Sequence, residues 1–158
     1  MEQGIVYLRR NRLVELENQL INLKTVARKE IAEAISEARS HGDLSENAEY
    51  DAAKEAQSHL ELKIGKLENL LSRVKILEPD DIPNGVVYVL TIVRVFDLKT
   101  KEESTYTLVS PDEADFELDK ISIISPLGKS LINKKVGEVA KVDVPAGIIE
   151  YKILEITK

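Results

Sequence analysis

The strongest constraint on the fold is a pair of heptad patterns in the first half of the chain. Residues 11–77 contain no proline, and apolar side chains recur there every three or four residues. The first pattern consists of Leu13, Leu16, Leu20, Leu23 and Ala27, and the second of Leu60, Ile64, Leu67, Leu71 and Val74. Such spacing is typical of a coiled-coil seam. We therefore expect two long helices that pack along one stripe each.

A short break between the two patterns predicts that the helices are antiparallel. Gly42 is suited to end the first helix, because glycine adopts a positive φ without a Cβ clash. Asp43 is a candidate N-cap for the second helix, with Glu46 as its capping-box partner. These signals predict helices over about residues 10–41 and 45–76, joined by a tight turn.

The apolar stripe is predicted to thin to alanine near the break. The alanines expected in the stripe are Ala27, Ala34 and Ala38 on the first helix and Ala48, Ala53 and Ala56 on the second. Since alanine lets helices approach closely, the tip of the hairpin should be narrow. The simpler interpretation of this shape is a plain coiled-coil spacer or a dimerisation hairpin.

The second half of the chain has a different composition. All five prolines lie in residues 79–158, and the stretch 78–85 contains two of them with an Asn-Gly pair, which predicts a linker. Strands are expected at 85–98, 104–110, 121–125, 139–144 and 148–156. A short helix is expected from Pro126 to Lys135, with Ser125 as its N-cap.

These patterns define an α+β chain with two domains. The predicted boundaries are 1–77 for an antiparallel two-helix coiled-coil hairpin with an acidic tip, 78–85 for the linker, and 86–158 for a globular domain. The globular domain is expected to be a small antiparallel β-sheet with one short helix.

Composition excludes several classes of function. The chain has 22 basic and 28 acidic residues and a formal net charge of −6, which disfavours nonspecific binding to nucleic acid. It has no cysteine, so disulfides, thiolate zinc sites and cysteine nucleophiles are excluded. His41 and His59 are the only histidines, too few for a histidine-rich metal site. Without a signal-peptide core or a membrane-length apolar run, we expect a cytoplasmic protein.

The predicted tip is the part of the chain with the most distinctive chemistry. Four carboxylates fall within nine residues, namely Asp43, Glu46, Glu49 and Asp51. Carboxylate oxygens suit Mg²⁺, which usually takes one or two protein carboxylates and completes its shell with water and phosphate oxygens. Two carboxylates would complete a site supplied by a partner rather than form one alone. Arg39 and Lys54 lie nearby and would contact phosphates without reading sequence.

Simpler explanations exist for each of these residues. Asp43 and Glu46 would serve only as the capping box, and Arg39 and Lys54 would be ordinary solvated charges. On spacing and chemistry alone, the sequence therefore predicts an acidic-tipped helical hairpin attached to a small β-rich domain.

Two segments resemble a known family. The run EARSHGDLSENAEYDAAKEAQ at 37–57 closely resembles the hairpin tip of the bacterial transcript cleavage factors, the GreA branch of the Gre family. DEADF at 112–116 and ISPLGKSLINKKVGE at 124–138 resemble the C-terminal domain of the same family, at a matching distance. The resemblance covers essentially the whole chain. It implies that the globular domain has an FK506-binding-protein-like fold.

The resemblance also implies a function. Factors of this family insert an acidic coiled-coil tip into the secondary channel of RNA polymerase. There they stimulate the polymerase's own Mg-dependent cleavage of nascent RNA in backtracked, arrested complexes. The expected partners are therefore RNA polymerase, at its channel rim and active centre, and the 3′ segment of the nascent RNA. A monomer is expected that is not itself an enzyme, binds no cofactor alone, shares Mg²⁺ with the polymerase and has no membrane partner.

The family's functional residues map onto this sequence by position. The two essential tip acids correspond to Asp43 and Glu46, which would hold the shared Mg²⁺. The RNA-contacting basic patch corresponds to Arg39 and Lys54. Leu44, Asn47 and Tyr50 are expected to support the tip, and Ser125 and Pro126 to dock on the polymerase.

One departure and two alternatives accompany this reading. The N-terminal VYLRRNRL lacks the threonine-x-x-glycine start common in the family and has Arg10 and Asn11 instead. The first alternative is a channel-binding regulator or inhibitor of polymerase that has the same fold but does not cleave, which the intact Asp43 and Glu46 disfavour. The second is an isomerase or chaperone acting through the C-terminal domain, which the scarcity of aromatic residues disfavours.

Overall fold

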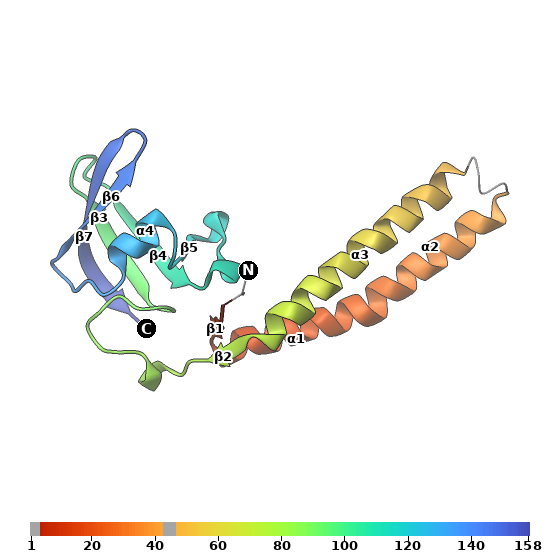
Figure 1. Ribbon diagram of the computed structural model, residues 1–158, viewed down its shortest axis with the longest axis horizontal. Coiled ribbons are helices and arrows are strands. Elements are labelled where there is room, and N and C mark those ends of the chain that lie inside the picture. The colour runs from red at the N-terminus through yellow and green to blue at the C-terminus, as the bar shows by residue number, and fades with distance from the viewer. Residues whose placement is uncertain (1–3, 43–46) are drawn as a thin grey trace. The chain divides into compact units, whose positions relative to one another are not determined.

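The computed structural model describes residues 4–42 and 47–158, and its chain divides into two compact units (Figure 1). One unit is the hairpin, residues 11–73, and the other contains residues 74–158 together with the N-terminal segment through Arg10. The division differs from the predicted boundaries, because the N-terminal residues and residues 74–77 group with the globular unit. Among the described residues, no helix is long and apolar enough to cross a membrane.

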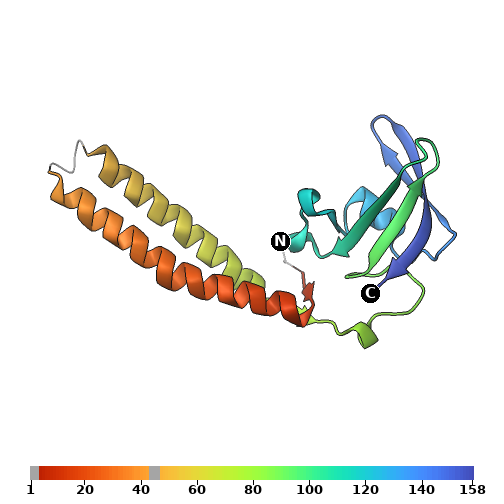
Figure 2. The same ribbon diagram turned by 180° about the vertical axis from the view of Figure 1, so that it is seen from behind.

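The hairpin unit consists of two long helical segments that run side by side in both views (Figures 1 and 2). The first segment comprises α1 (Arg10–Asn22), a π-helical turn η1 (Leu23–Ala27) and α2 (Arg28–Ser40). The second is α3 (Ala48–Ser72). The predicted antiparallel hairpin is confirmed, although the second helix is shorter at both ends than the expected 45–76.

The seam between the helices differs from the predicted one near the tip. The buried seam residues are Leu16, Ile35 and Ala38 on the first segment and Ala53, Leu60, Ile64 and Leu67 on the second. Ala34, Ala48 and Ala56 were expected in the seam, but all three are exposed. The prediction was therefore right for Ala38 and Ala53 and wrong for these three alanines.

The π-helical turn explains the shift on the first segment. The backbone N–H of Arg28 donates to the carbonyl of Leu23, five residues earlier, and the hydroxyl of Thr25 donates to the carbonyl of Ile21 at 2.7 Å. A π turn contains one more residue than an α turn. The heptad count beyond it therefore advances by one residue, so that Ile35 faces α3 in place of Ala34.

The globular unit begins with a small sheet that the sequence did not predict. Strand β1 (Val6–Leu8) pairs in parallel with β2 (Val74–Ile76). The backbone N–H of Tyr7 also donates to the hydroxyl of Ser110 at 2.9 Å. These pairings explain why the N-terminal segment belongs to the globular unit.

Five further strands form the main sheet of this unit, in the order β5-β4-β3-β7-β6. The strands are β3 (Ile92–Asp97), β4 (Glu103–Val109), β5 (Lys120–Ser122), β6 (Val139–Val144) and β7 (Gly147–Thr157). Neighbouring strands are antiparallel except β4 and β5, which are parallel, so the sheet is mixed rather than antiparallel throughout. Residues 85–91, expected to begin a strand, form turns and irregular backbone instead.

The predicted linker is an ordered part of the globular unit. A 3₁₀ turn, η2 (Pro79–Asp81), is closed by a reciprocal capping box between Glu78 and Asp81. The following Ile82 is only 2% exposed and belongs to a buried apolar cluster with Leu77, Val89 and Leu90. Two more 3₁₀ turns, η3 (Pro111–Glu113) and η4 (Phe116–Leu118), precede β5.

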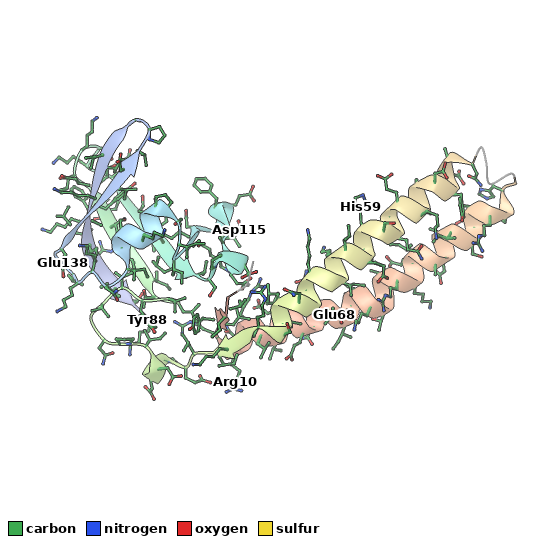
Figure 3. The ribbon with its side chains drawn as sticks, viewed as in Figure 1. Arg10, His59, Glu68, Tyr88, Asp115 and Glu138 are labelled. Carbon is green, nitrogen blue, oxygen red and sulfur yellow. The ribbon has the colours of Figure 1, made fainter. Side chains whose placement is uncertain are left out.

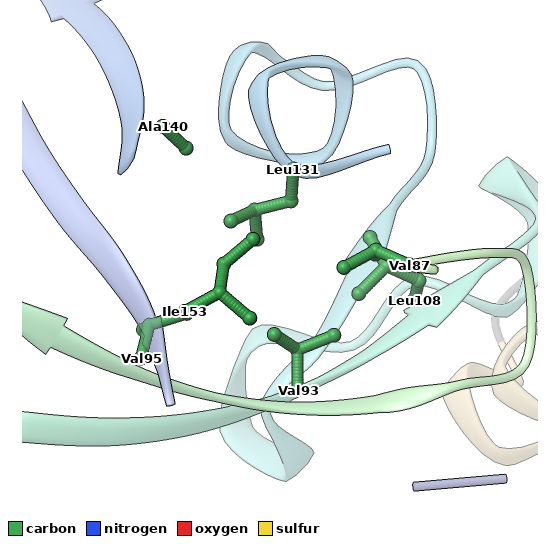
Figure 4. Packing of buried hydrophobic residues seen from close by; sticks show 7 residues of the cluster. All are labelled: Val87, Val93, Val95, Leu108, Leu131, Ala140 and Ile153. Carbon is green, nitrogen blue, oxygen red and sulfur yellow. The ribbon is translucent and has the colours of Figure 1, made fainter. Parts of the chain in front are cut away.

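The short helix α4 (Pro126–Leu131) packs on the main sheet and closes the core. Figure 4 shows Leu131 of α4 pointing toward Ile153 of the sheet, and both side chains are fully buried. The close approach requires Gly128, because a Cβ there would lie 1.9 Å from the carbonyl oxygen of Ser122. The remaining members of this core cluster are Val87, Val93, Val95, Leu108 and Ala140.

Candidate functional site: the hairpin tip and the start of helix α4

The structure describes the residues on both sides of the predicted tip acids. Asp43, Leu44 and Glu46 lie outside the described residues. Their described neighbours form the end of α2, through His41 and Gly42, and the start of α3, from Asn47 onward. The described part of the site therefore consists of these two helix ends.

Asn47 is the N-cap of α3. Its backbone is extended, with φ −93° and ψ 96°, and its side-chain oxygen accepts a hydrogen bond from the backbone N–H of Tyr50 at 3.1 Å. A side-chain oxygen in this position satisfies one of the free N–H groups of the first helical turn. The prediction that Asp43 caps this helix is therefore wrong, since α3 begins at Ala48.

Three contacts join the end of α2 to the start of α3. The side-chain amide nitrogen of Asn47 donates to the carbonyl of Ala38 at 2.5 Å. Nδ1 of His41 lies 2.8 Å from a carboxylate oxygen of Glu49. The third contact places the guanidinium of Arg39 over the ring of Tyr50, 5.7 Å from the ring centroid, within the range of a cation–π interaction. The sequence analysis did not predict the contact of His41 with Glu49 or that of Arg39 with Tyr50.

The two predicted RNA-contacting cations lie close to Tyr50. Arg39 rests on the Tyr50 ring, and Lys54 follows Tyr50 by one helical turn, so residues 50 and 54 lie on the same face of α3. The Lys54 ammonium donates to the side-chain oxygen of Gln57 at 2.9 Å, and both cations are exposed. His59 is different, because it points away from the hairpin and its side chain is 72% exposed (Figure 3).

The described residues near the tip do not by themselves form a metal site. Among the described residues, no three His, Asp or Glu side chains gather as a metal site, and Glu49 is engaged by His41. Asp51 is exposed, and Asp43 and Glu46, the two carboxylates predicted to share Mg²⁺, lie outside the described residues. Two carboxylates are hard oxygen ligands of the kind Mg²⁺ takes, but they are too few for a dedicated site.

The predicted docking residues lie at the start of α4. The hydroxyl of Ser125 accepts from the N–H of Gly128 at 3.1 Å and donates to the carbonyl of Ser122 at 2.6 Å, so it caps α4 as predicted. Pro126 is exposed, and the preceding Ile124 side chain is 60% exposed. Ser125 therefore shapes this surface, whereas Ile124 and Pro126 are available for contact.

Two hollows beside α4 were not predicted from the sequence. The first, about 300 Å³, is apolar and includes Tyr7, Tyr88 (labelled in Figure 3), Ile123 and Ile132 in its lining. The second, about 490 Å³, is polar, and its lining includes Lys129, Lys134 and Lys141. Lys129 and Ile132 line both hollows, so the two are adjacent. Tyr7 and Tyr88 gave no sequence signal, because they lie far apart in the chain and meet only in the folded unit.

Comparison with known proteins assigns both units to one family. Residues 6–76 match the family model described as "Transcription elongation factor, N-terminal". Residues 82–158 match the model described as "Transcription elongation factor, GreA/GreB, C-term". Together the two models span nearly the whole chain, in the order that the hairpin and sheet units occupy.

Individual relatives agree with this assignment. Transcription elongation factor GreA of Chlorobaculum tepidum is 52% identical over 152 residues, covering 96% of each chain. The GreA of Amoebophilus asiaticus is 49% identical over 155 residues, covering 98% of this chain and 99% of the relative. A solved structure of GreA factor homolog 1 from Thermus thermophilus is 29% identical, covers 99% of this chain and 100% of its own, and has a TM-score of 0.45. The two family models and the GreA relatives together identify the class of protein as a transcription elongation factor. The chain belongs to the GreA/GreB family.

Proposed function

We propose that this protein acts on RNA polymerase as a transcript cleavage factor. In this proposal the hairpin enters the secondary channel, and its tip stimulates the polymerase's intrinsic cleavage of nascent RNA in backtracked, arrested complexes. The protein is inert alone and acts only within the complex. Family membership supports the choice of partner, and the chemistry of the tip supports the choice of reaction.

The observation that carries the proposal is the N-cap of α3. The simpler explanation for Asp43 and Glu46 was a capping box that starts this helix. Asn47 performs that role instead, through its hydrogen bond with the N–H of Tyr50. Two acidic residues at the turn of a long hairpin therefore need another explanation, and ligation of a metal ion offers one.

In the proposed mechanism, Asp43 and Glu46 would hold a Mg²⁺ ion that the polymerase active centre shares. When bound, this ion would supply orientation and activation of the attacking water. The carboxylates raise the local affinity for the ion without forming a complete site. Catalysis is then a matter of position and charge, because the polymerase already provides the rest of the reacting centre.

In this proposal Arg39 and Lys54 bind the RNA. Their exposed charges lie next to Tyr50, close to the helix ends that flank the acids. They would contact the phosphates of the extruded 3′ segment and hold it without reading its sequence.

The surface around α4 is the proposed docking region. Exposed Ile124 and Pro126 lie beside the apolar hollow, and the adjacent hollow is lined by Lys129, Lys134 and Lys141. Residues 78–158 carry 10 basic and 15 acidic residues, so three lysines around one hollow stand out in an acidic unit. This combination fits a polymerase surface with an apolar anchor and nearby carboxylates.

The direct test is a cleavage assay on stalled, backtracked polymerase complexes with and without the full-length protein. The proposal expects shortened nascent RNA only when polymerase, Mg²⁺ and this protein are all present, and no cleavage of free RNA by the protein alone. Binding to polymerase with slowed elongation and no cleavage would instead identify a non-cleaving regulator of the channel.

A further inference from the structure

We propose that Asn47 is a positioning residue that ties the two ends of the tip segment together with its amide group. Its oxygen starts α3, and its nitrogen holds the last turn of α2. The inference rests on the proposed function, because the tied segment carries the two acids. His41 and Glu49 form a second tie beside it.

The orientation of the Asn47 amide is fixed by its two partners. The N–H of Tyr50 can only donate, so it requires the amide oxygen at 3.1 Å. The carbonyl of Ala38 can only accept, so it requires the amide nitrogen at 2.5 Å. A flipped amide would place donor against donor and acceptor against acceptor, so a single orientation satisfies both neighbours.

Few side chains can perform both tasks. Aspartate caps a helix as well as asparagine does, but its ionised carboxylate donates no hydrogen bond. Serine also caps well, but its hydroxyl is too short to reach a carbonyl on the neighbouring helix at the same time. The identity of residue 47 is therefore explained by the tie and not by the cap alone.

Apolar packing near the tip is weak, which leaves the polar ties to hold the helix ends. The last buried seam residues before the tip are Ala38 and Ala53, and alanine buries little surface. The carbonyl of Ala38 receives the N–H of His41 at 3.2 Å as well as the Asn47 amide. The 2.8 Å contact between His41 and Glu49 closes the same gap from its outer side. Together these contacts connect residues 38 and 41 with residues 47 and 49.

We expect fixed helix ends to restrict the chain that runs between them. Closing a short loop at both ends removes much of its conformational freedom before it meets a partner. Catalytic groups held near their working positions act far faster than groups that must be ordered during the reaction. Loss of the tie should therefore reduce stimulated cleavage more than it reduces stability.

The test uses full-length variants that separate the cap from the tie. Asn47→Ser and Asn47→Asp keep an N-cap acceptor and lose the donor to Ala38, whereas Asn47→Ala loses both. Asn69→Ser, near the other end of α3, is the matched control. Each variant is assayed for thermal stability, amide hydrogen exchange over residues 42–47, polymerase affinity and cleavage of backtracked complexes.

Expected results differ clearly between these variants. Asn47→Ser and Asn47→Asp should melt close to the wild type, exchange faster over residues 42–47 and lose cleavage about ten- to a hundredfold at unchanged polymerase affinity. Asn47→Ala should show the same loss of cleavage, with a melting temperature lower by about 4–8 °C because the cap is also gone. Asn69→Ser should behave as the wild type.

Two outcomes would overturn the inference. The first is wild-type exchange over residues 42–47 in Asn47→Ser, which would show that no tie was lost. The second is faster exchange with undiminished cleavage, which would show that the tie does not position the acids. If the wild-type protein itself stimulates no cleavage, the proposed function fails, but the exchange comparison still tests whether Asn47 ties the helix ends.

The second tie has its own conservative variant. Glu49→Gln keeps an oxygen that can meet the His41 ring, whereas Glu49→Ala removes it. The inference expects faster exchange over residues 42–47 in Glu49→Ala and near-wild-type exchange in Glu49→Gln. Equal exchange in the two variants would show that the contact between His41 and Glu49 does not tie the helix ends.

Discussion

The guanidinium of Arg28 makes two hydrogen bonds to the carboxylate of Glu61, from Nε to Oε1 and from Nη2 to Oε2, each 2.9 Å long. The pair joins α2 to α3 just beyond the π-helical turn. Hydrogen bonding to Arg28 lowers the pKa of Glu61 below its ordinary value, and the same bonds raise the pKa of Arg28. Lys24 and Glu68 form a looser bridge between the segments, at 3.5 Å.

We predict that Glu61→Gln destabilises the hairpin slightly at neutral pH and not at all in acid. Since the pKa of Glu61 is lower in the folded state, its contribution is present above the unfolded pKa and disappears as the pH falls through the folded pKa. Both side chains are about half exposed, so high salt should also reduce the effect. Thermal melts at neutral pH and at about pH 3 measure this. Glu55→Gln is the control, and an equal effect of Glu61→Gln at both pH values would contradict the prediction.

The π-helical turn predicts an asymmetry between deletion and insertion. Deleting Val26 removes the extra residue, so a continuous α-helix would still bring Ile31, Ile35 and Ala38 to the seam. Inserting one alanine after Val26 adds a second extra residue and turns the distal half by about 100°. We expect the deletion to melt near the wild-type temperature and the insertion to melt much lower. Equal losses in the two variants would show that the turn is not the site of register adjustment.

The hairpin illustrates what a sequence pattern predicts and where it stops. Heptad spacing predicted the two helices and their antiparallel packing, because the pattern is local and repeats many times. It placed Ala34 in the seam because nothing in LKTVA marks a π turn, which is formed by the bond from the Arg28 N–H to the Leu23 carbonyl and flanked by the bond from the Thr25 hydroxyl to the Ile21 carbonyl. The pairing of β1 with β2 was not predicted for a related reason, since it joins segments nearly seventy residues apart.

Two glycines should respond oppositely to alanine. A Cβ on Gly128 would clash with the backbone of Ser122, so Gly128→Ala should destabilise the globular unit by about 1–3 kcal/mol. Gly65 lies within α3 and has nothing within 4 Å of its Cβ position, so Gly65→Ala should stabilise the hairpin by about 0.5–1 kcal/mol. Denaturant unfolding of both variants measures these changes. A tolerated Gly128→Ala would contradict the close packing of α4 on the sheet.

The basic pair at the tip should matter most for long extruded RNA. Arg39→Ala combined with Lys54→Ala removes two exposed phosphate contacts, and a longer 3′ segment offers more phosphates to lose. We expect cleavage to fall most with the longest backtracked RNA, and the difference from wild type to shrink as salt rises. The measurement is cleavage rate against backtrack length at several salt concentrations. A uniform loss that does not depend on salt would indicate a disturbed tip instead.

The sequence predicted the contacts at the hairpin tip only in part. Arg39, Asn47 and Tyr50 were singled out from the sequence, and the structure places them in contacts between the two helix ends. The cap was assigned to Asp43, because Asp-x-x-Glu and Asn-x-x-Tyr both offer plausible helix starts. The choice between them depends on the carbonyl of Ala38, which accepts a hydrogen bond from an amide at residue 47. Contacts of this kind join residues on opposite sides of a turn, so local propensity does not reveal them.

The central claim is that Asp43 and Glu46 act on the polymerase reaction and not on the fold of the hairpin. The most direct measurement compares cleavage of backtracked complexes by wild type, Asp43→Asn, Glu46→Gln and the exposed control Asp51→Asn, each at saturating protein. The account predicts cleavage reduced by about a hundredfold or more for the first two variants, with polymerase affinity and melting temperature unchanged, and wild-type cleavage for Asp51→Asn. Wild-type cleavage rates for both Asp43→Asn and Glu46→Gln would contradict it.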